Sequence, residues 1–190
     1  PINLAAYNNA SGGCFDCNCV ITMADGTKKS LKNINKDDFV MSVDKNNNIV
    51  KARVICVVEM KITMQTREMV DLEGGLSITP WHPIKKDNKW TFPANIKSPI
   101  VKSCQSVITL VLDDYHIGFI NGYQCIMLGH GFTGDVISHP YYGTQKVLDD
   151  LKQNYGYQFG KVVITDYDVK FNNSNNRNVH LINNTLVNVY

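Results

Sequence analysis

A cysteine preceded by two glycines is the first feature of this sequence that could do chemistry. In Gly12-Gly13-Cys14-Phe15 the glycines leave the backbone free to bend immediately before the thiol. The Cys14 sulfur can attack the carbonyl carbon of Gly13, exchange the amide for a thioester and free its own amine. This exchange is uphill unless the amide is strained or polarised, so the chain must supply a helper elsewhere.

A threonine and a histidine three residues apart are candidates for that helper. They are Thr79 and His82, within Ser77-Ile78-Thr79-Pro80-Trp81-His82-Pro83, where the two prolines stiffen the turn. Histidine suits acid and base chemistry because its pKa lies near neutrality. A lone histidine between prolines is more often a packed or surface residue, but the presence of Cys14 upstream favours a role for His82 in the reaction.

The residues that follow Cys14 resemble the N-terminal block of the Hint superfamily, the fold of hedgehog autoprocessing domains and inteins. The shared features are a nucleophile, a strand, the turn Asp25-Gly26 and an aspartate two residues before a valine, here Asp38 and Val40. The family usually has a glycine before that aspartate, where this chain has Asp37. The resemblance implies an all-β Hint fold, horseshoe-like and with pseudo-two-fold symmetry.

Thr79 and His82 also match a motif of this family, Thr-x-x-His. In the family the histidine hydrogen-bonds the scissile amide and assists its breakdown, and the threonine helps to bind the same peptide unit. The resemblance therefore implies these roles for His82 and Thr79, with Gly13 as the residue before the scissile bond. Hedgehog-type domains add an acidic residue that activates an external nucleophile, and Glu59 occupies a comparable region of this chain.

Residues 107–122 resemble the block that inteins carry near their C-terminus. That block consists of a strand, an acidic residue, a histidine, an aromatic residue and Asn-Gly. The resemblance implies a role in cleavage at the C-terminal junction for His116 and for one of Asp113 and Asp114. A standard intein would end a few residues later, whereas this chain continues.

The continuation of the chain is similar to a eukaryotic branch of Hint domains. It includes Cys125-Ile126-Met127-Leu128-Gly129-His130-Gly131-Phe132 and His139-Pro140-Tyr141-Tyr142-Gly143-Thr144. The branch comprises bacterial-intein-like domains found beside von Willebrand A modules and in ciliate proteins, where they also occur between ubiquitin-like modules. Gly12-Gly13 resembles the end of a ubiquitin-like module. The partners implied are therefore the flanking domains of the same precursor, ubiquitin-like ones in one version of the hypothesis.

The last apolar strip of the chain contains a second place where chemistry could occur. Inteins end in an apolar strand, His and Asn, followed by Ser, Thr or Cys; Asn184 and Thr185 match this pattern, whereas Asn183 replaces the histidine. An asparagine side chain can attack its own carbonyl, close a succinimide ring and cut the chain, if a group polarises that carbonyl. The groups that could assist Asn184 are His116, His130 and His180. The alternative is that Asn183-Asn184 belongs to an Asn-rich tail.

Together these residues favour a self-processing, intein-like domain over residues 14–184, flanked by residues 1–13 and 185–190. In this hypothesis Cys14 forms a thioester with Gly13, Thr185 accepts the acyl group, and Asn184 cyclises so that the two flanks are joined. Cys125 is a second candidate for the acceptor. In an alternative the domain only cleaves, by hydrolysis or aminolysis of the thioester. Neither reaction requires a cofactor.

A binding or spacer module is a hypothesis from another class. Cys14, Cys17 and Cys19 are soft thiolate ligands at a spacing that could hold zinc. A metal on Cys14 would mask the nucleophile, so such a zinc would regulate the reaction rather than serve it.

Short apolar and β-branched runs separated by turn residues predict an all-β core. The runs cover residues 19–23, 38–43, 49–60, 68–71, 76–78 and 107–112. One short helix is predicted near residues 144–152, where Val147, Leu148 and Leu151 have helical spacing and Thr144 could cap the helix. Further strands are predicted at 161–164 and 179–190.

The composition is that of a globular chain of 190 residues, long enough for one large domain or two small ones. Its 19 Lys and Arg balance 17 Asp and Glu, without a long block of one sign, so nucleic acid is not an expected partner. Because no run reaches the roughly 18 to 20 apolar residues of a membrane span, a membrane is not expected either. The six cysteines do not form the framework of a small secreted protein, so we expect reduced thiols and a cytoplasmic location.

Overall fold

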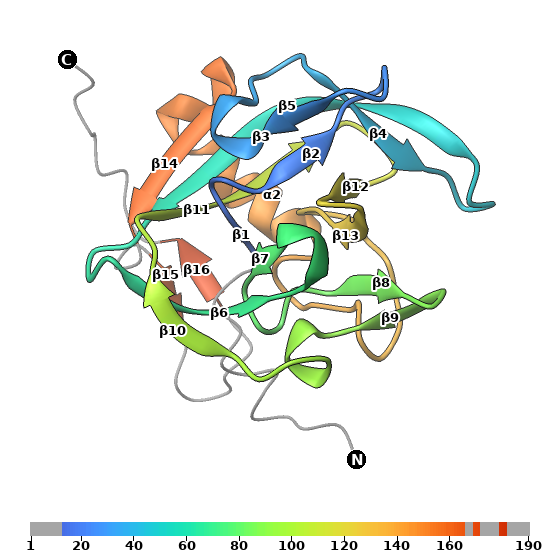
Figure 1. Ribbon diagram of the computed structural model, residues 1–190. Coiled ribbons are helices and arrows are strands. Elements are labelled where there is room, and N and C mark those ends of the chain that lie inside the picture. The colour runs from blue at the N-terminus through green and yellow to red at the C-terminus, as the bar shows by residue number, and fades with distance from the viewer. Residues whose placement is uncertain (1–12, 166–168, 172–178, 182–190) are drawn as a thin grey trace.

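Strands make up most of the structure, a computed structural model that describes residues 13–165, 169–171 and 179–181 (Figure 1). Each apolar run within the first 165 residues forms a strand, and the structure adds others between them. The strands are β1 (Phe15–Asp16), β2 (Val20–Thr22), β3 (Lys28–Ser30), β4 (Phe39–Val43), β5 (Ile49–Lys61), β6 (Thr66–Asp71), β7 (Ser77–Ile78), β8 (Ile84–Lys86), β9 (Lys89–Thr91), β10 (Ile100–Ser103), β11 (Ser106–Leu112), β12 (Ile117–Ile120), β13 (Tyr123–Ile126), β14 (Lys161–Thr165), β15 (Val169–Phe171) and β16 (Val179–Leu181).

The larger sheet brings the start of the chain into its middle. Its strand order is β10-β6-β7-β1-β11-β5-β14, and β4 pairs with another part of β5. Phe15 of β1 pairs with Ile108 of β11 on one side and with Ile78 of β7 on the other, both antiparallel. β11 is buried along all seven residues, as expected for a nearly continuous apolar run in a central strand. Figure 1 shows β1 near the centre of the molecule, beside β7 and β11.

The second sheet is built from hairpins, one of which was predicted from its turn residues. Its strand order is β3-β2-β12-β13-β8-β9. Gly26 has φ 86° in the turn between β2 and β3, where Asp25-Gly26 predicted a tight turn. Asp37 has φ 69°, so it adopts a conformation that favours the glycine usual in the family, and its Oδ1 accepts a hydrogen bond from Arg53 Nη1 at 3.0 Å.

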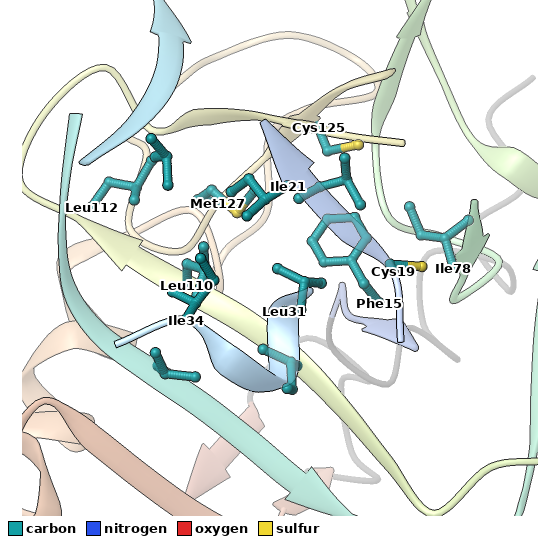
Figure 2. Close-up of a cluster of buried hydrophobic side chains, with 14 of the residues drawn as sticks. Phe15, Cys19, Ile21, Leu31, Ile34, Ile78, Leu110, Leu112, Cys125 and Met127 are labelled. Atoms are coloured by element: carbon teal, nitrogen blue, oxygen red, sulfur yellow. The ribbon is translucent and has the colours of Figure 1, made fainter. Parts of the chain in front are cut away.

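Two hydrophobic clusters lie on opposite sides of the nucleophile segment. The Phe15 cluster contains Phe15, Cys19, Ile21, Leu31 and Cys125 among its buried residues (Figure 2). The Cys14 cluster contains Cys14, Val58, Met60, Leu128 and Val162 among its buried residues. Because neighbouring residues of an extended chain point to opposite faces, Cys14 and Phe15 enter different clusters.

The predicted short helix is present as α2 (Gln145–Lys152), which covers the Cys14 cluster with Val147 and Leu151. Thr144 occupies the N-cap position, but it makes no capping hydrogen bond, because its Oγ1 donates to the Tyr141 carbonyl oxygen at 2.9 Å. Within the described residues the expectation of an all-β fold with one short helix is thus confirmed, and the capping role of Thr144 is wrong. No helix in the described part of the chain is long and apolar enough to cross a membrane.

Candidate functional site

Thr79 holds the backbone of Cys14 by two reciprocal hydrogen bonds. The Cys14 N–H donates to Thr79 Oγ1 at 3.0 Å, and the Thr79 N–H donates to the Cys14 carbonyl oxygen at 3.0 Å. The pairing of β1 with β7 brings these residues together, although 65 positions separate them in the sequence. The amide nitrogen that would leave Gly13 during acyl transfer is therefore fixed by one threonine side chain.

The ring of His82 lies directly against Gly13. A Cβ on Gly13 would lie 2.7 Å from Cγ and 2.8 Å from Nδ1 of His82, so only glycine fits without displacing the ring. His82 Nε2 donates to the Ile126 carbonyl oxygen at 2.6 Å, because a carbonyl can only accept. In the neutral ring Nδ1 therefore carries a lone pair, and it is buried without a hydrogen-bond partner. His82 also packs on Phe15, with the ring centroids 4.4 Å apart.

Burial sets the resting protonation states of the thiol and the imidazole. It raises the pKa of the Cys14 thiol to about 11, while the Arg67 guanidinium acts in the opposite direction. It lowers the pKa of His82 to about 4; the hydrogen bond to Ile126 opposes this shift, and the charge of His130 adds to it. At neutral pH the site thus contains a neutral thiol and a neutral imidazole whose Nδ1 can accept a proton.

Two cavities meet at the bond between Gly13 and Cys14. The His82 cavity is lined by Gly13, Trp81, His82, Pro83, Phe92, Thr109, Ile126, Met127, Leu128, His130, Val136, Ile137, Ser138, His139 and Tyr142. The Cys14 cavity is lined by Gly13, Cys14, Val58, Met60, Thr109, Leu128, Tyr141, Tyr142, Val147, Leu151 and Ile164. The walls of both are mostly apolar.

Two further histidines line the His82 cavity. His130 Nδ1 accepts from the Phe132 N–H at 2.9 Å, and His139 Nδ1 accepts from the Tyr142 N–H at 2.9 Å. Burial lowers the pKa of each to about 4, so both rings are neutral and carry their proton on Nε2. His130 was predicted to assist at the C-terminal junction, and the structure places it near the N-terminal one. His139 was not chosen as a site residue, because its only sequence signal was membership of the segment His139–Thr144.

The intein-like residues after β11 line neither cavity, although the His116 carbonyl oxygen accepts a hydrogen bond at 2.8 Å from the N–H of Met127, which lines the His82 cavity. Asp113 Oδ1 accepts from the Arg53 N–H at 2.8 Å, and Asp114 Oδ1 accepts from the Tyr115 N–H at 2.7 Å. His116 Nδ1 is buried without a partner; burial lowers its pKa, and the charges of Asp114 and Asp113 oppose that shift. None of Asp113, Asp114 and His116 lines either cavity. The structure therefore does not bring these three residues to Gly13.

Glu59 is occupied by ion pairs. Its carboxylate oxygens lie 2.6 Å from Lys61 Nζ and 3.0 Å from Lys161 Nζ. Burial acts to raise the pKa of Glu59, but hydrogen bonds from Lys61 and Lys161 outweigh it and the pKa is lowered. Glu59 lines neither cavity, so the structure gives no support to a role in activating an external nucleophile.

The cysteines proposed as zinc ligands do not converge. Cys14 lies in one hydrophobic cluster and Cys19 in the other, where the Cys19 thiol donates to the Ser77 carbonyl oxygen at 3.3 Å. Within the described residues no group of three His, Cys, Asp or Glu side chains is arranged to hold a metal ion. Cys125 is also in the Phe15 cluster, where its thiol donates to the Tyr123 carbonyl oxygen at 3.4 Å. The candidate acceptor Cys125 therefore does not line the Cys14 cavity.

The C-terminal junction lies mostly outside the described residues. Asn184 and Thr185 are beyond them, as are residues 182–190 of the strand predicted at 179–190. The backbone of β16 pairs antiparallel with β15, and His180 lies opposite Lys170 in that pair. The parts that Asn184, Thr185 and the His180 side chain would play remain predictions from the sequence.

Comparisons with known proteins agree with this architecture. Residues 13–179 match the family Vint, described as a Hint-domain. Among solved structures, a DnaB intein from Synechocystis sp. PCC 6803 has a TM-score of 0.51 at 14% identity, covering 61% of this chain and 99% of the intein. A bacterial intein-like domain from Clostridium thermocellum has a TM-score of 0.51 at 14% identity, covering 62% and 99%. No curated protein matches the sequence.

Proposed function

The chain belongs to the Hint-domain family, and from this premise we propose that it processes its own polypeptide through a thioester between Gly13 and Cys14. The observation that carries the proposal is the arrangement around the scissile peptide bond. Thr79 holds both backbone groups of Cys14, while the unpartnered Nδ1 of His82 lies against Gly13. The fold alone would not favour catalysis, because folds host many functions.

In the proposed first step, Cys14 Sγ attacks the carbonyl carbon of Gly13. The new bond joins sulfur to that carbon, and the bond from the carbon to the Cys14 nitrogen breaks. The thiol proton ends on the leaving nitrogen, which becomes an amine, and His82 Nδ1 is placed to accept and return it. Thr79 Oγ1 holds the leaving nitrogen through its N–H during this exchange.

The protonation states make this step slow in the resting protein. Burial keeps the proton on the Cys14 thiol, whose pKa is about 11, and disfavours a proton on the His82 ring, whose pKa is about 4, so complete transfer between them before the attack is unfavourable. A thiolate formed in advance is therefore scarce at neutral pH. The proton must move as the carbon–sulfur bond forms, and any change that hydrates Cys14 or recruits a positive charge would accelerate the step.

Splicing is the full reaction that we propose. The Thr185 hydroxyl accepts the acyl group, Asn184 cyclises and releases residues 14–184, and an O-to-N shift joins Gly13 to Thr185. This half of the proposal rests on the sequence at the C-terminal junction. The eukaryotic branch of the family, a ubiquitin-like flanking module and a cytoplasmic location also remain proposals.

Cleavage at the N-terminal junction alone is the second candidate, and one observation favours it. Asp113 is tied to Arg53, and neither it nor His116 lines the cavities around Gly13. Two of the residues assigned to the second junction, Asp113 and His116, are thus outside the lining of the described thioester site, whereas His130 lines the His82 cavity. In that case water or an amine takes the acyl group from Cys14, and no ligation follows.

Intact mass spectrometry of the precursor with its natural flanks tests both candidates. The chain is incubated with and without dithiothreitol, beside Cys14→Ala and Asn184→Ala variants. A product lacking residues 14–184, absent from both variants, supports splicing. Thiol-dependent cleavage only before Cys14 supports the cleavage reaction and reduces Asn184 to a tail residue. A wild-type chain that stays intact in both conditions contradicts the thioester and favours a binding module.

A further inference from the structure

Thr109 is one of two hydroxyl-bearing residues that line both cavities at the scissile bond, the other being Tyr142. It lies in the middle of β11, where it pairs with Val58 of β5. On the other side of β11, Ile108 pairs with Phe15, so the next residue, Thr109, lies level with Cys14. Gly13, Cys14 and Thr109 share the wall of the Cys14 cavity, which places the hydroxyl beside the reacting groups.

The Thr109 hydroxyl is unpaired in the resting protein. The residue is 3% exposed, and its Oγ1 is buried without a hydrogen-bond partner. Leaving a buried hydroxyl unpaired is destabilising, and valine has nearly the same shape without that cost. An O–H group that is buried and unpaired, in a residue that lines a cavity beside a reaction centre, is suited to a partner that forms only during the reaction.

His82, Thr79 and His130 are poorly placed to donate a hydrogen bond to the Gly13 oxygen. The Nε2–H of His82 is engaged by the Ile126 carbonyl oxygen, and Nδ1 offers only a lone pair. Thr79 Oγ1 already accepts from the leaving nitrogen of Cys14. His130 directs Nε2 toward Gly143, where a Cβ would lie 2.8 Å from it. Thr109 therefore offers a hydroxyl without a partner on a wall that Gly13 shares, whereas Tyr142 is already engaged by other groups.

We propose that the Thr109 hydroxyl donates a hydrogen bond to the Gly13 oxygen when the Cys14 sulfur adds to the Gly13 carbonyl carbon. This inference rests on the proposed thioester reaction. As the carbon–sulfur bond forms, the π electrons of the carbonyl move onto oxygen, and the resulting oxyanion accepts the hydrogen bond without taking the proton. When the carbonyl reforms, the carbon–nitrogen bond breaks, and the nitrogen keeps the proton that came from the thiol.

The test compares Thr109→Val, Thr109→Ser and wild type in the precursor with its flanks. The first-order rate of dithiothreitol-induced cleavage before Cys14 is followed by intact mass, and thermal unfolding is measured on each protein. Thr109→Val is expected to cleave about 100-fold more slowly, as on loss of an oxyanion donor, while melting at the same or a higher temperature. Thr109→Ser keeps the hydroxyl and is expected to stay within a few-fold of the wild-type rate.

Ser42→Ala provides a matched control. Ser42 of β4 is also fully buried with an unpartnered Oγ, but it lines neither cavity. Its variant is expected to keep the wild-type cleavage rate. Equal rates in Thr109→Val and wild type overturn the inference, as does an equal loss of rate in Thr109→Val and Thr109→Ser. A wild-type chain that thiol does not cleave overturns the proposed function itself, and the inference with it.

Discussion

His82 and Gly13 are in direct contact, so closely that a Cβ on residue 13 would lie 2.7 Å from Cγ of the His82 ring. This contact explains in steric terms why a glycine precedes the nucleophile. The absence of a side chain lets the imidazole reach the scissile peptide, with Nε2 held by Ile126 and Nδ1 left unpartnered. The relationship leads to the first prediction.

Gly13→Ala is expected to displace the His82 ring and to slow thiol-induced cleavage before Cys14. Overpacking of this kind typically costs about 1 to 3 kcal/mol of stability. The free energy of unfolding of Gly13→Ala, His82→Ala and the double variant forms a cycle that isolates the contact. The stability cost of Gly13→Ala should largely disappear in the His82→Ala background. Additive losses would show that the two residues do not interact.

Thr79→Val keeps the shape of the side chain but removes its oxygen. It should therefore separate the role of Thr79 in holding the scissile peptide from its role in packing. The change leaves the buried Cys14 N–H without its acceptor, at a cost of about 1 to 3 kcal/mol. It should also slow cleavage by on the order of 10 to 100-fold, because the leaving nitrogen is no longer held. Thr79→Ser retains the oxygen and should recover most of the rate. Chemical denaturation and intact-mass kinetics measure the two effects, and a Thr79→Val chain that reacts like wild type would contradict the role.

The stability of the folded chain should fall between pH 6.5 and pH 4. The folded pKa of His82 is about 4 against an ordinary value of 6.5, so below pH 6.5 the unfolded chain binds a proton that the folded chain excludes. The contribution of His82 to the free energy of unfolding is complete above pH 6.5 and amounts to about 3 kcal/mol. It is lost as the pH approaches 4. Burial depresses the pKa values of His130 and His139 to about 4 as well, so they act in the same direction.

Chemical denaturation of wild type and His82→Asn at several pH values checks this prediction. The difference between the two proteins removes the contribution of carboxylates, which titrate in both. Wild type should lose more stability than the variant on acidification through this window. Parallel pH profiles would mean that His82 is not buried in its neutral form.

Arg67→Met should slow formation of the thioester. The Arg67 guanidinium lowers the pKa of Cys14 against the larger effect of burial, and its Nε and Nη2 atoms are buried without a partner. Without that charge the thiol pKa rises, and the cleavage rate at pH 8 should fall by up to roughly tenfold for each pKa unit gained, because less negative charge can develop on sulfur as it attacks. Arg53→Met is the matched control, because Arg53 pairs with Asp37 and Asp113, away from both cavities. Equal rates in the two variants would exclude an electrostatic role for Arg67.

Zinc should not control the described site. Cys14 and Cys19 lie in different hydrophobic clusters, and a chelator is therefore expected to leave the cleavage rate unchanged. Elemental analysis of the purified precursor is expected to find well under one zinc per chain. One tightly bound zinc per chain, lost in Cys17→Ser, would restore the metal-binding hypothesis.

Local pattern was enough to predict some of the elements that hold the site, such as β7, β11 and α2. The alternation and β-branching of residues 49–60 and 107–112 predicted β5 and β11, and Asp25-Gly26 predicted the first hairpin turn. The strands β1, β3, β10, β12, β13 and β15 were not predicted, and neither was the hairpin of β8 and β9. Their turn has φ 49° at Asp87 and 60° at Asn88, without the glycine that would have identified it. Family motifs singled out Cys14, Thr79 and His82, which the structure brings together.

The reactive groups could be identified from the amino-acid sequence, namely a thiol after a glycine, a threonine and a histidine three residues apart, and some of the strands that carry them. Only the tertiary structure decided that Thr109, and not Asp113, lies beside Gly13, and that burial sets the pKa values of Cys14 and His82. The difference arises from the distance along the chain over which each feature is determined. Turns and strand periodicity depend on near neighbours, whereas registry between distant strands and removal from water depend on how the whole chain packs.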